Sequence, residues 1–303
     1  MRQEYLHRPT AEATWWAEPD TQVLGGYDLH RPAHGTWLGV TRQGRIAVLT
    51  NYREQDASVV EGARSRGLIP NAWLKSDPAV QESTEQFARR MIEHDGVQGV
   101  GSFSLCYGFV QDVVTSGHAE AKGLAIISNR TPDVSGVVRL LTGGGETHAL
   151  SNAAYADRTW PKVLNGEVWT QDAIQASVAA NDTRDQLVDR LLAVLRTDTM
   201  PRKKENEDWD MYLNQLRHSI FIPAIGRDHL EEHNMPAHEV GDVVKQKAAD
   251  ATSGCYGTQK SIIVLVNTEG RLFYFERTLF DGEARPIPQG HGDRKFEFQI
   301  EGW

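Results

Sequence analysis

Two runs of apolar and β-branched residues flank a short polar turn near the start of the chain, and together they predict a β-hairpin. The runs are residues 35–40 (GTWLGV) and 46–54 (IAVLTNYRE), with residues 41–44 as the turn. Gly44 can supply the positive φ that a short turn needs. Residues 46–49 are apolar without alternation, so we expect this strand to be covered on both of its faces.

Polar side chains come directly after that second strand. Asn51, Tyr52, Arg53 and Glu54 bring an amide, a phenol, a guanidinium and a carboxylate to the point where a buried strand meets solvent. Sheet proteins commonly place binding sites at such ends. The alternative is that the four residues cap a sheet edge and pair with one another, since structural networks also cluster polar groups.

Further along the chain, hydrophobic periodicity predicts strands, then helices, then strands again. The expected strands are residues 100–110, 124–130, 261–266, 272–276 and 295–300. The expected helices are residues 83–94, 160–178 and 183–195, with Ser83 and Thr183 as N-caps, and residues 209–216 repeat the helical spacing. The glycine-rich residues 142–146 are expected to form a hairpin turn, because no Lys-Ser/Thr pair follows to make a phosphate loop.

This order of elements differs from the regular βαβ alternation of a parallel sheet. It favours an α+β layered sandwich whose antiparallel sheets are completed by the two ends of the chain. We find no linker, repeat or low-complexity tract. The sequence therefore predicts one domain over residues 1–303, with a polar surface insertion around residues 227–252.

The composition narrows the class of protein. A net charge of -9 over 303 residues argues against a nucleic-acid binder, which needs a basic face. Two cysteines indicate a reducing compartment, and Cys106 is expected to be a buried, inert thiol. No apolar run approaches the roughly 20 residues that span a bilayer, and the N-terminus has no secretory h-region. We expect a cytoplasmic protein.

The search for catalytic or metal-binding motifs gives weak signals only. Residues 229–233 (HLEEH) have the H-x-x-E-H spacing of inverted zinc proteases, but their polar surroundings indicate a solvated insertion, so no metal site is predicted. There is no G-x-S-x-G elbow. Polar sets stand at several predicted strand ends: Arg2 with Glu4, residues 51–54, residues 151–152 and residues 256–260. In a sandwich some of these sets would converge on one rim, and the alternative of separate turn residues stays open.

Four sequence blocks resemble one known family. They are residues 1–9 (MRQEYLHRP), residues 35–40 with 49–53, residues 150–153 with 160–162, and residues 256–260. The first block resembles a degraded Asn-Arg-Asp-Glu motif followed by aromatic-x-x-Arg-Pro. In this order the blocks resemble the NRDE family, also called transport and Golgi organization protein 2. Residues 219–223 resemble its fungal-type members most.

The resemblance implies a fold and a catalytic constellation. The fold is a four-layer αββα sandwich similar to the N-terminal-nucleophile hydrolases. There, by analogy, an N-terminal cysteine would be nucleophile and base, with the motif's arginine and aspartate beside it and asparagines stabilising an oxyanion. Arg2 matches the arginine, and Asn152, then Asn51, are the asparagine candidates. Gln3 replaces the aspartate and the cysteine is missing, so we expect an N-terminally shortened chain that cannot run this hydrolysis.

Two functions follow from the resemblance as expectations. The first is a role in Golgi organisation and protein secretion as a non-catalytic carrier of haem or acyl lipid, cytoplasmic with Golgi or mitochondrial association at the membrane periphery. No resident cofactor is expected, and haem would be cargo. The second is an N-terminal-cysteine amide or thioester hydrolase active only in a longer isoform. The ligand-binding candidates are Arg2, Glu4, Asn51, Tyr52, Arg53, Asn152 and Lys260. Four histidines near the motifs could ligate iron but are more often surface or turn residues: His7, His30, His34 and His148.

Overall fold

A computed structural model describes most of the chain, and its contacts divide into two compact units. The described residues are 1–51, 65–80, 82–95, 97, 100–114, 122–141, 145–204, 212, 214–225 and 255–303. The first unit comprises Met1–Pro9, Thr159–Ile263 and Phe275–Arg294, and the second comprises Thr10–Arg158, Val264–Tyr274 and Lys295–Trp303. The expectation of a single domain stays a prediction. The expected insertion at residues 227–252 lies outside the described residues.

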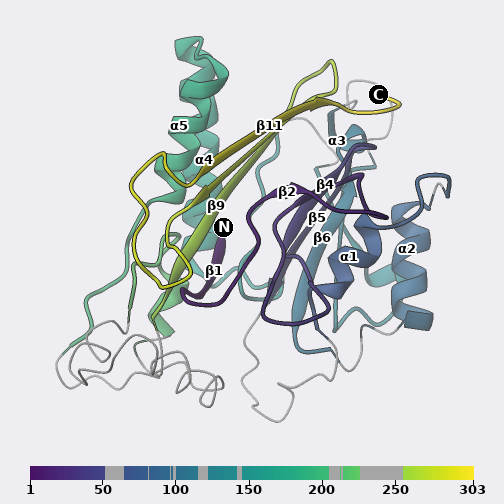
Figure 1. Cartoon of the computed structure of the whole chain (residues 1–303), viewed down its shortest axis with the longest axis horizontal. Helices are drawn as coiled ribbons and strands as arrows, with labels where there is room; N and C mark the ends of the chain where they lie inside the picture. The colour runs from purple at the N-terminus through teal and green to yellow at the C-terminus, as the bar shows by residue number, and fades with distance from the viewer. Residues whose placement is uncertain are drawn as a thin grey trace. The chain divides into compact units, whose positions relative to one another are not determined.

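One sheet joins strands from the two ends of the chain, as predicted. Its order is β1-β9-β10-β11, and β1 pairs with β9 in antiparallel fashion beside the N-terminus (Figure 1). The strands are β1 (Arg2–Tyr5), β9 (Tyr256–Val266), β10 (Arg271–Thr278) and β11 (Asp293–Gln299). The predicted turn between β9 and β10 is present, and Gly270 takes the positive φ of 77° there.

The second sheet has seven strands in sequence order, from β2 to β8. Each neighbouring pair is antiparallel. The strands are β2 (Thr14–Trp15), β3 (Val23–Gly25), β4 (Leu38–Thr41), β5 (Arg45–Asn51), β6 (Phe103–Phe109), β7 (Leu124–Ser128) and β8 (Val138–Leu140). The β4–β5 hairpin is confirmed, with φ of 82° at Gly44. The mixed α/β content with antiparallel sheets is as expected, whereas the four-layer αββα arrangement stays a prediction.

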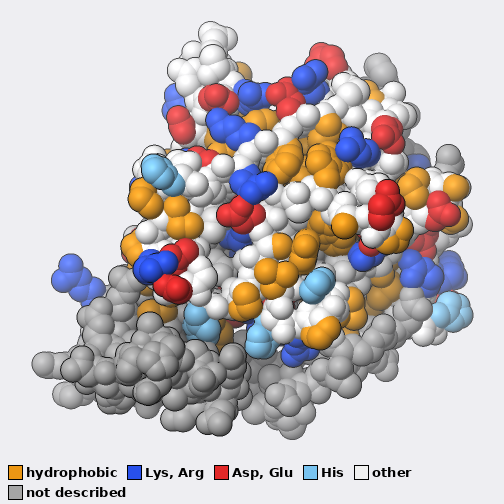
Figure 2. All heavy atoms as spheres, viewed as in Figure 1, with side chains coloured by type: hydrophobic (Ala, Val, Ile, Leu, Met, Phe, Trp, Pro, Cys, Tyr) orange, Lys and Arg blue, Asp and Glu red, His pale blue; other side chains and the backbone are white. Residues whose placement is uncertain are grey.

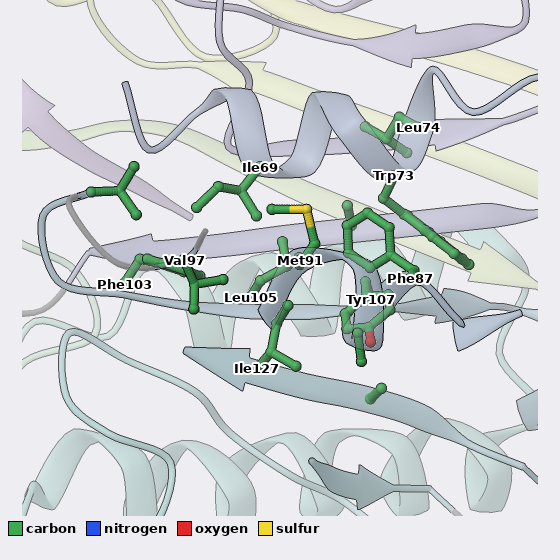
Figure 3. Packing of buried hydrophobic residues seen from close by; sticks show 14 of the residues in the cluster. Ile69, Trp73, Leu74, Phe87, Met91, Val97, Phe103, Leu105, Tyr107 and Ile127 are labelled. Atoms are coloured by element: carbon green, nitrogen blue, oxygen red, sulfur yellow. The ribbon is translucent and has the colours of Figure 1, made fainter. Parts of the chain in front are cut away.

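Two short helices cover one face of the seven-stranded sheet (Figure 1). They are α1 (Leu68–Leu74) and α2 (Thr84–Arg90), which continues as the π-helix η2 (Met91–Asp95). Figure 3 shows Trp73 and Phe87 from these helices packed over Leu105 and Tyr107 of β6. The ring centroids of Trp73 and Tyr107 lie 5.2 Å apart, edge to face. This apolar layer is the core between the helices and the seven-stranded sheet.

The prediction that β5 is covered on both of its faces is confirmed in part. Arg45 and Ala47 point to the helices and are buried, whereas Ile46 and Val48, on the opposite face, are only half-buried. A short unbroken apolar run fits a strand covered on one face and partly screened on the other equally well. Val40, the cross-strand partner of Ile46, and Leu24, the partner of Val40, lie on that same face and are 0% exposed, so the face is closed over the neighbouring strands.

The middle of the chain forms the predicted helical pair in the first unit. The helices are α4 (Pro161–Ala180) and α5 (Arg184–Leu195), which pack against each other as a hairpin (Figure 1). Pro161 stands at the first position of α4, where its missing N–H costs nothing. Thr183 and Gln186 form a capping box at the start of α5. Both predicted helices are confirmed.

The remaining described elements are short. They are α3 (Gln111–Val114), η3 (Val134–Gly136) and η4 (Asn214–Arg217). Most of the predicted helix at residues 209–216 lies outside the described residues. The described residues contain no helix with the length and apolar character needed to cross a membrane.

Candidate functional site

The pairing of β1 with β9 brings two of the predicted polar sets together. Arg2 lies opposite Lys260, and Glu4 lies opposite Gly257, with an irregularity in register between Arg2 and Gln3. Residues from the opening motif and from the block 256–260 thus become hydrogen-bonded neighbours. This juxtaposition confirms that at least two of the polar sets converge.

Arg2 is held in place by side chains on both strands. Its guanidinium donates to the amide oxygen of Gln259 and lies 3.7 Å from the carboxylate of Glu4. Gln259 in turn donates to the backbone oxygens of Leu6 and Arg8, at 3.2 and 3.1 Å. Arg2 is 8% exposed, so its charge sits at the edge of the sheet in a fixed and largely desolvated position.

Lys260 belongs to a buried ion pair. Its ammonium donates to the carboxylate of Glu276 at 2.9 Å and to the hydroxyl of Thr278 at 3.2 Å. Lys260 is 1% exposed and Glu276 is 0% exposed. Breaking a buried pair of this kind leaves an uncompensated charge in the protein interior. Ligand binding by Lys260 stays a prediction.

Lys162 is a second buried lysine that the sequence did not single out as a candidate. It lies in the first turn of α4, is 6% exposed, and its ammonium is 3.5 Å from the amide oxygen of Gln3. Burial lowers the pKa of Lys162 to about 8. The signal available in the sequence was its place in the Trp160-Pro161-Lys162 block, which gives no indication of burial.

In the second unit, three asparagines gather where β5 ends and β6 begins. Asn152 donates to the backbone oxygen of Asn51 at 2.7 Å, and Asn129 accepts from the backbone N–H of Phe103 at 3.3 Å. Phe103 and Asn51 are cross-strand partners. Asn129 was not predicted as a candidate, although Ser128-Asn129-Arg130 repeats the pattern of Thr50-Asn51-Tyr52-Arg53 at the end of a neighbouring strand.

Residues 142–144 of the expected hairpin turn lie outside the described residues, and the placement of Asn152 at a strand end is wrong. Residues 146–152 form no strand, so Asn152 reaches Asn51 from an irregular segment. Irregular backbone suits this contact because an asparagine side chain can replace a strand partner in satisfying a carbonyl. Tyr52 and Arg53 lie outside the described residues.

A row of hydroxyls crosses the seven-stranded sheet beside the asparagines. Thr50 pairs with Ser104, and Ser104 pairs with Ser128, so all three side chains share one face. The Ser128 hydroxyl accepts from the backbone N–H of Arg130 at 3.1 Å. Within the described part of the chain, the buried hydroxyls of Thr50 and Ser104 have no hydrogen-bond partner. The sequence analysis did not single out this row of hydroxyls.

Neither cysteine is poised for nucleophilic attack. Cys106, on β6, has its pKa raised to about 12 by burial, so its thiolate is scarce at neutral pH. Cys255 is 3% exposed, and both thiols are free of disulfides. Cys106 is of intermediate exposure, so the expectation of a fully buried thiol is met only in part, and its inertness stays a prediction.

The histidines are engaged in local contacts. His148 lies 3.0 Å from both Tyr155 and Glu146, and the ring of His34 stacks on Tyr27. The described residues contain no group of three or more His, Cys, Asp or Glu placed to hold a metal ion. The H-x-x-E-H spacing at residues 229–233 lies outside the described residues.

The predicted site residues fall into two groups. Arg2, Glu4 and Lys260 belong to the first unit, and Asn51 and Asn152 belong to the second. Contacts within each unit link Arg2 to Glu4 and Asn152 to Asn51. That all five line a common rim stays a prediction.

Charge on the described surface is mixed. Figure 2 shows acidic and basic side chains interspersed over the face in view, and the described residues gather into no broad basic area there. With a net charge of -9, long-range attraction of an anion has no basis on this face. Binding of an anionic group to this face would therefore depend on individual side-chain contacts.

Comparison with known proteins places this geometry in a family. Residues 1–281 match the family model described as Transport and Golgi organisation 2. The chain is 27% identical to the human Transport and Golgi organization protein 2 homolog, over 99% of this chain and 91% of the human protein. It is 27% identical to the mouse Transport and Golgi organization 2 homolog, over 93% of this chain and 86% of the mouse protein. It is also 23% identical to an uncharacterized protein of Saccharomyces cerevisiae, over 99% of this chain and 94% of that protein.

Proposed function

Because the chain belongs to the Transport and Golgi organisation 2 family, we propose that it acts in Golgi organisation and protein secretion as a carrier of a small amphipathic ligand. The proposed ligand classes are haem and acyl lipid, each of which has an apolar body and an anionic group. The carrier works in the cytoplasm, with peripheral association to Golgi or mitochondrial membranes. The names of the mammalian relatives support the Golgi role.

The observation that carries the proposal is the setting of Arg2. Its guanidinium is nearly buried, donates to the neutral amide of Gln259, and lies 3.7 Å from the carboxylate of Glu4. A fixed, desolvated cation binds a carboxylate or phosphate more strongly than a mobile surface one. The Tyr5 and Tyr256 rings, with centroids 5.8 Å apart, add aromatic surface next to it, as a site for an amphipathic ligand requires.

The raised pKa of Cys106 and the burial of Cys255 favour the carrier function over a cysteine hydrolase. Thioester or amide hydrolysis by a cysteine needs a thiolate near neutral pH. Burial holds the pKa of Cys106 at about 12, and Cys255 is inaccessible at 3% exposure. The alternative function, a hydrolase of the N-terminal-nucleophile type, therefore needs a nucleophile other than these two cysteines.

Ligand titration tests the proposal. The protein is titrated with haem, followed by absorbance, and with a long-chain acyl-CoA, followed by tryptophan fluorescence. We expect saturable binding of at least one ligand, weakened about tenfold or more in Arg2→Gln because a charge-assisted hydrogen bond is lost. Arg202→Gln, at an exposed position, serves as the matched control and should bind like the unaltered protein.

Two results would contradict the carrier proposal. The first is the absence of saturable binding for both ligands. The second is binding that is equally strong in Arg2→Gln, which would remove Arg2 from the site.

A further inference from the structure

Apolar side chains of α4 face solvent along the length of the helix. Among the described residues seven large hydrophobic side chains are exposed, and four of the seven lie on this one helix. They are Leu164, Val168, Ile174 and Val178, with exposed fractions of 41%, 57%, 39% and 73%. The neighbouring helix α5 contributes none of the seven. Single exposed apolar residues are ordinary on a protein surface, whereas a group of them on one element marks an interaction site.

The inward side of α4 is a separate surface. Val163, Gly166 and Ser177 are buried, and at 3.6 residues per turn they lie on another side of the helix from the four exposed residues. A helix that is apolar on more than one side is normally covered on each of them. The described residues cover the inward side of α4 and leave its outward side exposed.

The outward side has the spacing of a helix–helix seam. The seam residues follow one another at intervals of four, three, four and three positions, and they are Leu164, Val168, Gln171, Gln175 and Val178. This spacing places side chains on one stripe and is that of the contact positions in paired helices. Because α4 has 20 residues, the seam extends about two turns to either side of Gln171.

The apolar residues are placed symmetrically about Gln171. Leu164 and Val178 lie seven residues to either side of it, and Val168 and Ile174 lie three residues to either side. If a second α4 packs antiparallel with the two Gln171 residues at a two-fold axis, each of these apolar residues faces an apolar residue of the other copy. A stripe that is complementary to itself points to a second copy of this chain as its partner.

The charges beside the seam fit the same antiparallel arrangement. Glu167 and Gln175 lie four residues to either side of Gln171, and Asp172 and Thr170 lie one residue to either side. In the antiparallel pair each carboxylate therefore faces an amide or a hydroxyl, and both of these groups can donate a hydrogen bond. A parallel pair would bring each carboxylate level with its own copy, and the like charges would repel.

The charges also argue against a membrane surface as the partner of α4. Lys162 is the only basic residue of this helix and is buried, whereas Glu167 and Asp172 border the seam. Helices that lie on membranes carry Lys and Arg on their polar face, and anionic lipids attract these residues. The outward side of α4 lacks that attraction.

We propose that α4 is a self-association surface through which two copies of the chain form a dimer, with their α4 helices packed antiparallel about Gln171. The pair of Gln171 amides at the axis fixes the register of the apolar contacts. A single helical seam buries less than the roughly 1,200 Å² of a standard stable interface, so we expect a weak dimer with a Kd on the order of tens of micromolar. The inference does not depend on the carrier function proposed above, because it uses a different set of residues.

Sedimentation velocity at protein concentrations below and above that Kd tests the surface. We expect the unaltered protein to change from monomer to dimer as its concentration rises. Val168→Glu places a carboxylate in the seam and should weaken the dimer about tenfold or more. Val80→Glu is the matched control, because Val80 has the same exposed fraction of 57% and lies in the other unit. Both substitutions are at exposed positions, so the dilute monomers should keep the Tm of the unaltered protein.

The two-fold axis allows a second test that looks for restored association. Gln171→Glu and Gln171→Lys each bring two like charges together at the axis, so each variant alone should be monomeric at concentrations where the unaltered protein is dimeric. An equimolar mixture of the two variants brings a carboxylate to an ammonium and should restore a dimer that contains one copy of each.

Four results would overturn the proposal. The first is a monomer at every concentration, and the second is Val168→Glu that dimerises like the unaltered protein. The third is a mixture of the two Gln171 variants that stays monomeric. The fourth is a monomer that cosediments with vesicles containing phosphatidylserine and loses this binding in Val168→Glu, which would identify a membrane as the partner of α4.

Discussion

Replacing Lys162 by methionine should stabilise the protein near neutral pH. The ammonium is 6% exposed and has one long hydrogen bond, 3.5 Å to Gln3. In the unfolded chain a lysine has a pKa of about 10.4, whereas burial lowers the pKa of Lys162 to about 8 in the folded protein. The pKa values in the unfolded and folded states thus differ by roughly two and a half units. This difference means that burying the protonated ammonium destabilises the folded protein by about 3 kcal/mol.

The same shift fixes how stability depends on pH. Between about pH 8 and about pH 10.4 the unfolded chain binds a proton at Lys162 that the folded protein has released, so the free energy of unfolding rises with pH across this window. Below about pH 8 the lysine is protonated in both states, and the full cost of burying its charge lowers the free energy of unfolding. Above about pH 10.4 the lysine is neutral in both states, so no charge is buried and the cost disappears. Methionine has a similar length, no charge and no pH dependence, so the gain from Lys162→Met should shrink as the pH rises through the window.

Urea unfolding in a buffer free of phosphate measures both effects. We expect Lys162→Met to raise the free energy of unfolding by about 2 to 3 kcal/mol near pH 7, after the loss of one weak hydrogen bond, and by close to zero near pH 10.4. Lys295→Met, an exposed matched control, should stay within about 0.5 kcal/mol at both pH values. Taking the difference cancels the other groups that titrate in this range, apart from the Met1 α-amino group, whose pKa is lowered by burial and by the nearby Lys162. Destabilisation by Lys162→Met near pH 7, or a gain that does not change with pH, would refute the reasoning.

Three further predictions concern stability and thiol reactivity. Lys260→Met should lower the free energy of unfolding in urea by about 3 to 5 kcal/mol, because it leaves Glu276 buried and charged. The double variant Lys260→Met with Glu276→Leu should recover most of this loss. A double variant no more stable than the single one would contradict this account. Ser83→Ala should cost about 1 kcal/mol by removing a capping box at the start of α2, and no measurable change would show the box to be unimportant. Cys255, 3% exposed, should react with a thiol reagent only after denaturation, and Cys106 should react slowly in the native protein at neutral pH because its pKa is raised to about 12. Rapid reaction of either thiol in the native protein would contradict this expectation.

Elements with local signals were predictable from the sequence. Ser83 and Thr183 predict the starts of two helices, and the structure contains a capping box at each of them. Gly44 announces the β4–β5 turn through its positive φ. In each case the residues that determine the conformation are neighbours in the chain, so the pattern alone carries the information.

The helix α1 could not be predicted from local signals. It has seven residues, includes Pro70, and its N-cap makes no side-chain hydrogen bond. A helix so short is marginal by itself. It is stabilised instead by burying Trp73 and Leu74, both 0% exposed, against the seven-stranded sheet. Tertiary packing of this kind leaves no periodic trace in a segment of this length.

In the candidate site, too, the local features could be predicted from the sequence and the tertiary contacts could not. The opening motif and residues 256–260 could be singled out as polar blocks, and their pairing across β1 and β9 follows from a sheet completed by both chain ends. The approach of Lys162 to Gln3, 159 positions apart, could not be foreseen. It depends on how α4 lies against β1, and no sequence pattern records that contact.

The central claim is that the protein holds an amphipathic ligand and returns it unchanged. Its most direct test is to incubate the protein with a stoichiometric amount of a long-chain acyl-CoA, separate bound from free ligand, and quantify intact thioester and free CoA thiol. The account predicts bound thioester recovered intact, with less bound by Arg2→Gln. Release of free CoA thiol in excess of the protein, with the activity lost in Arg2→Gln, would contradict it and establish a hydrolase.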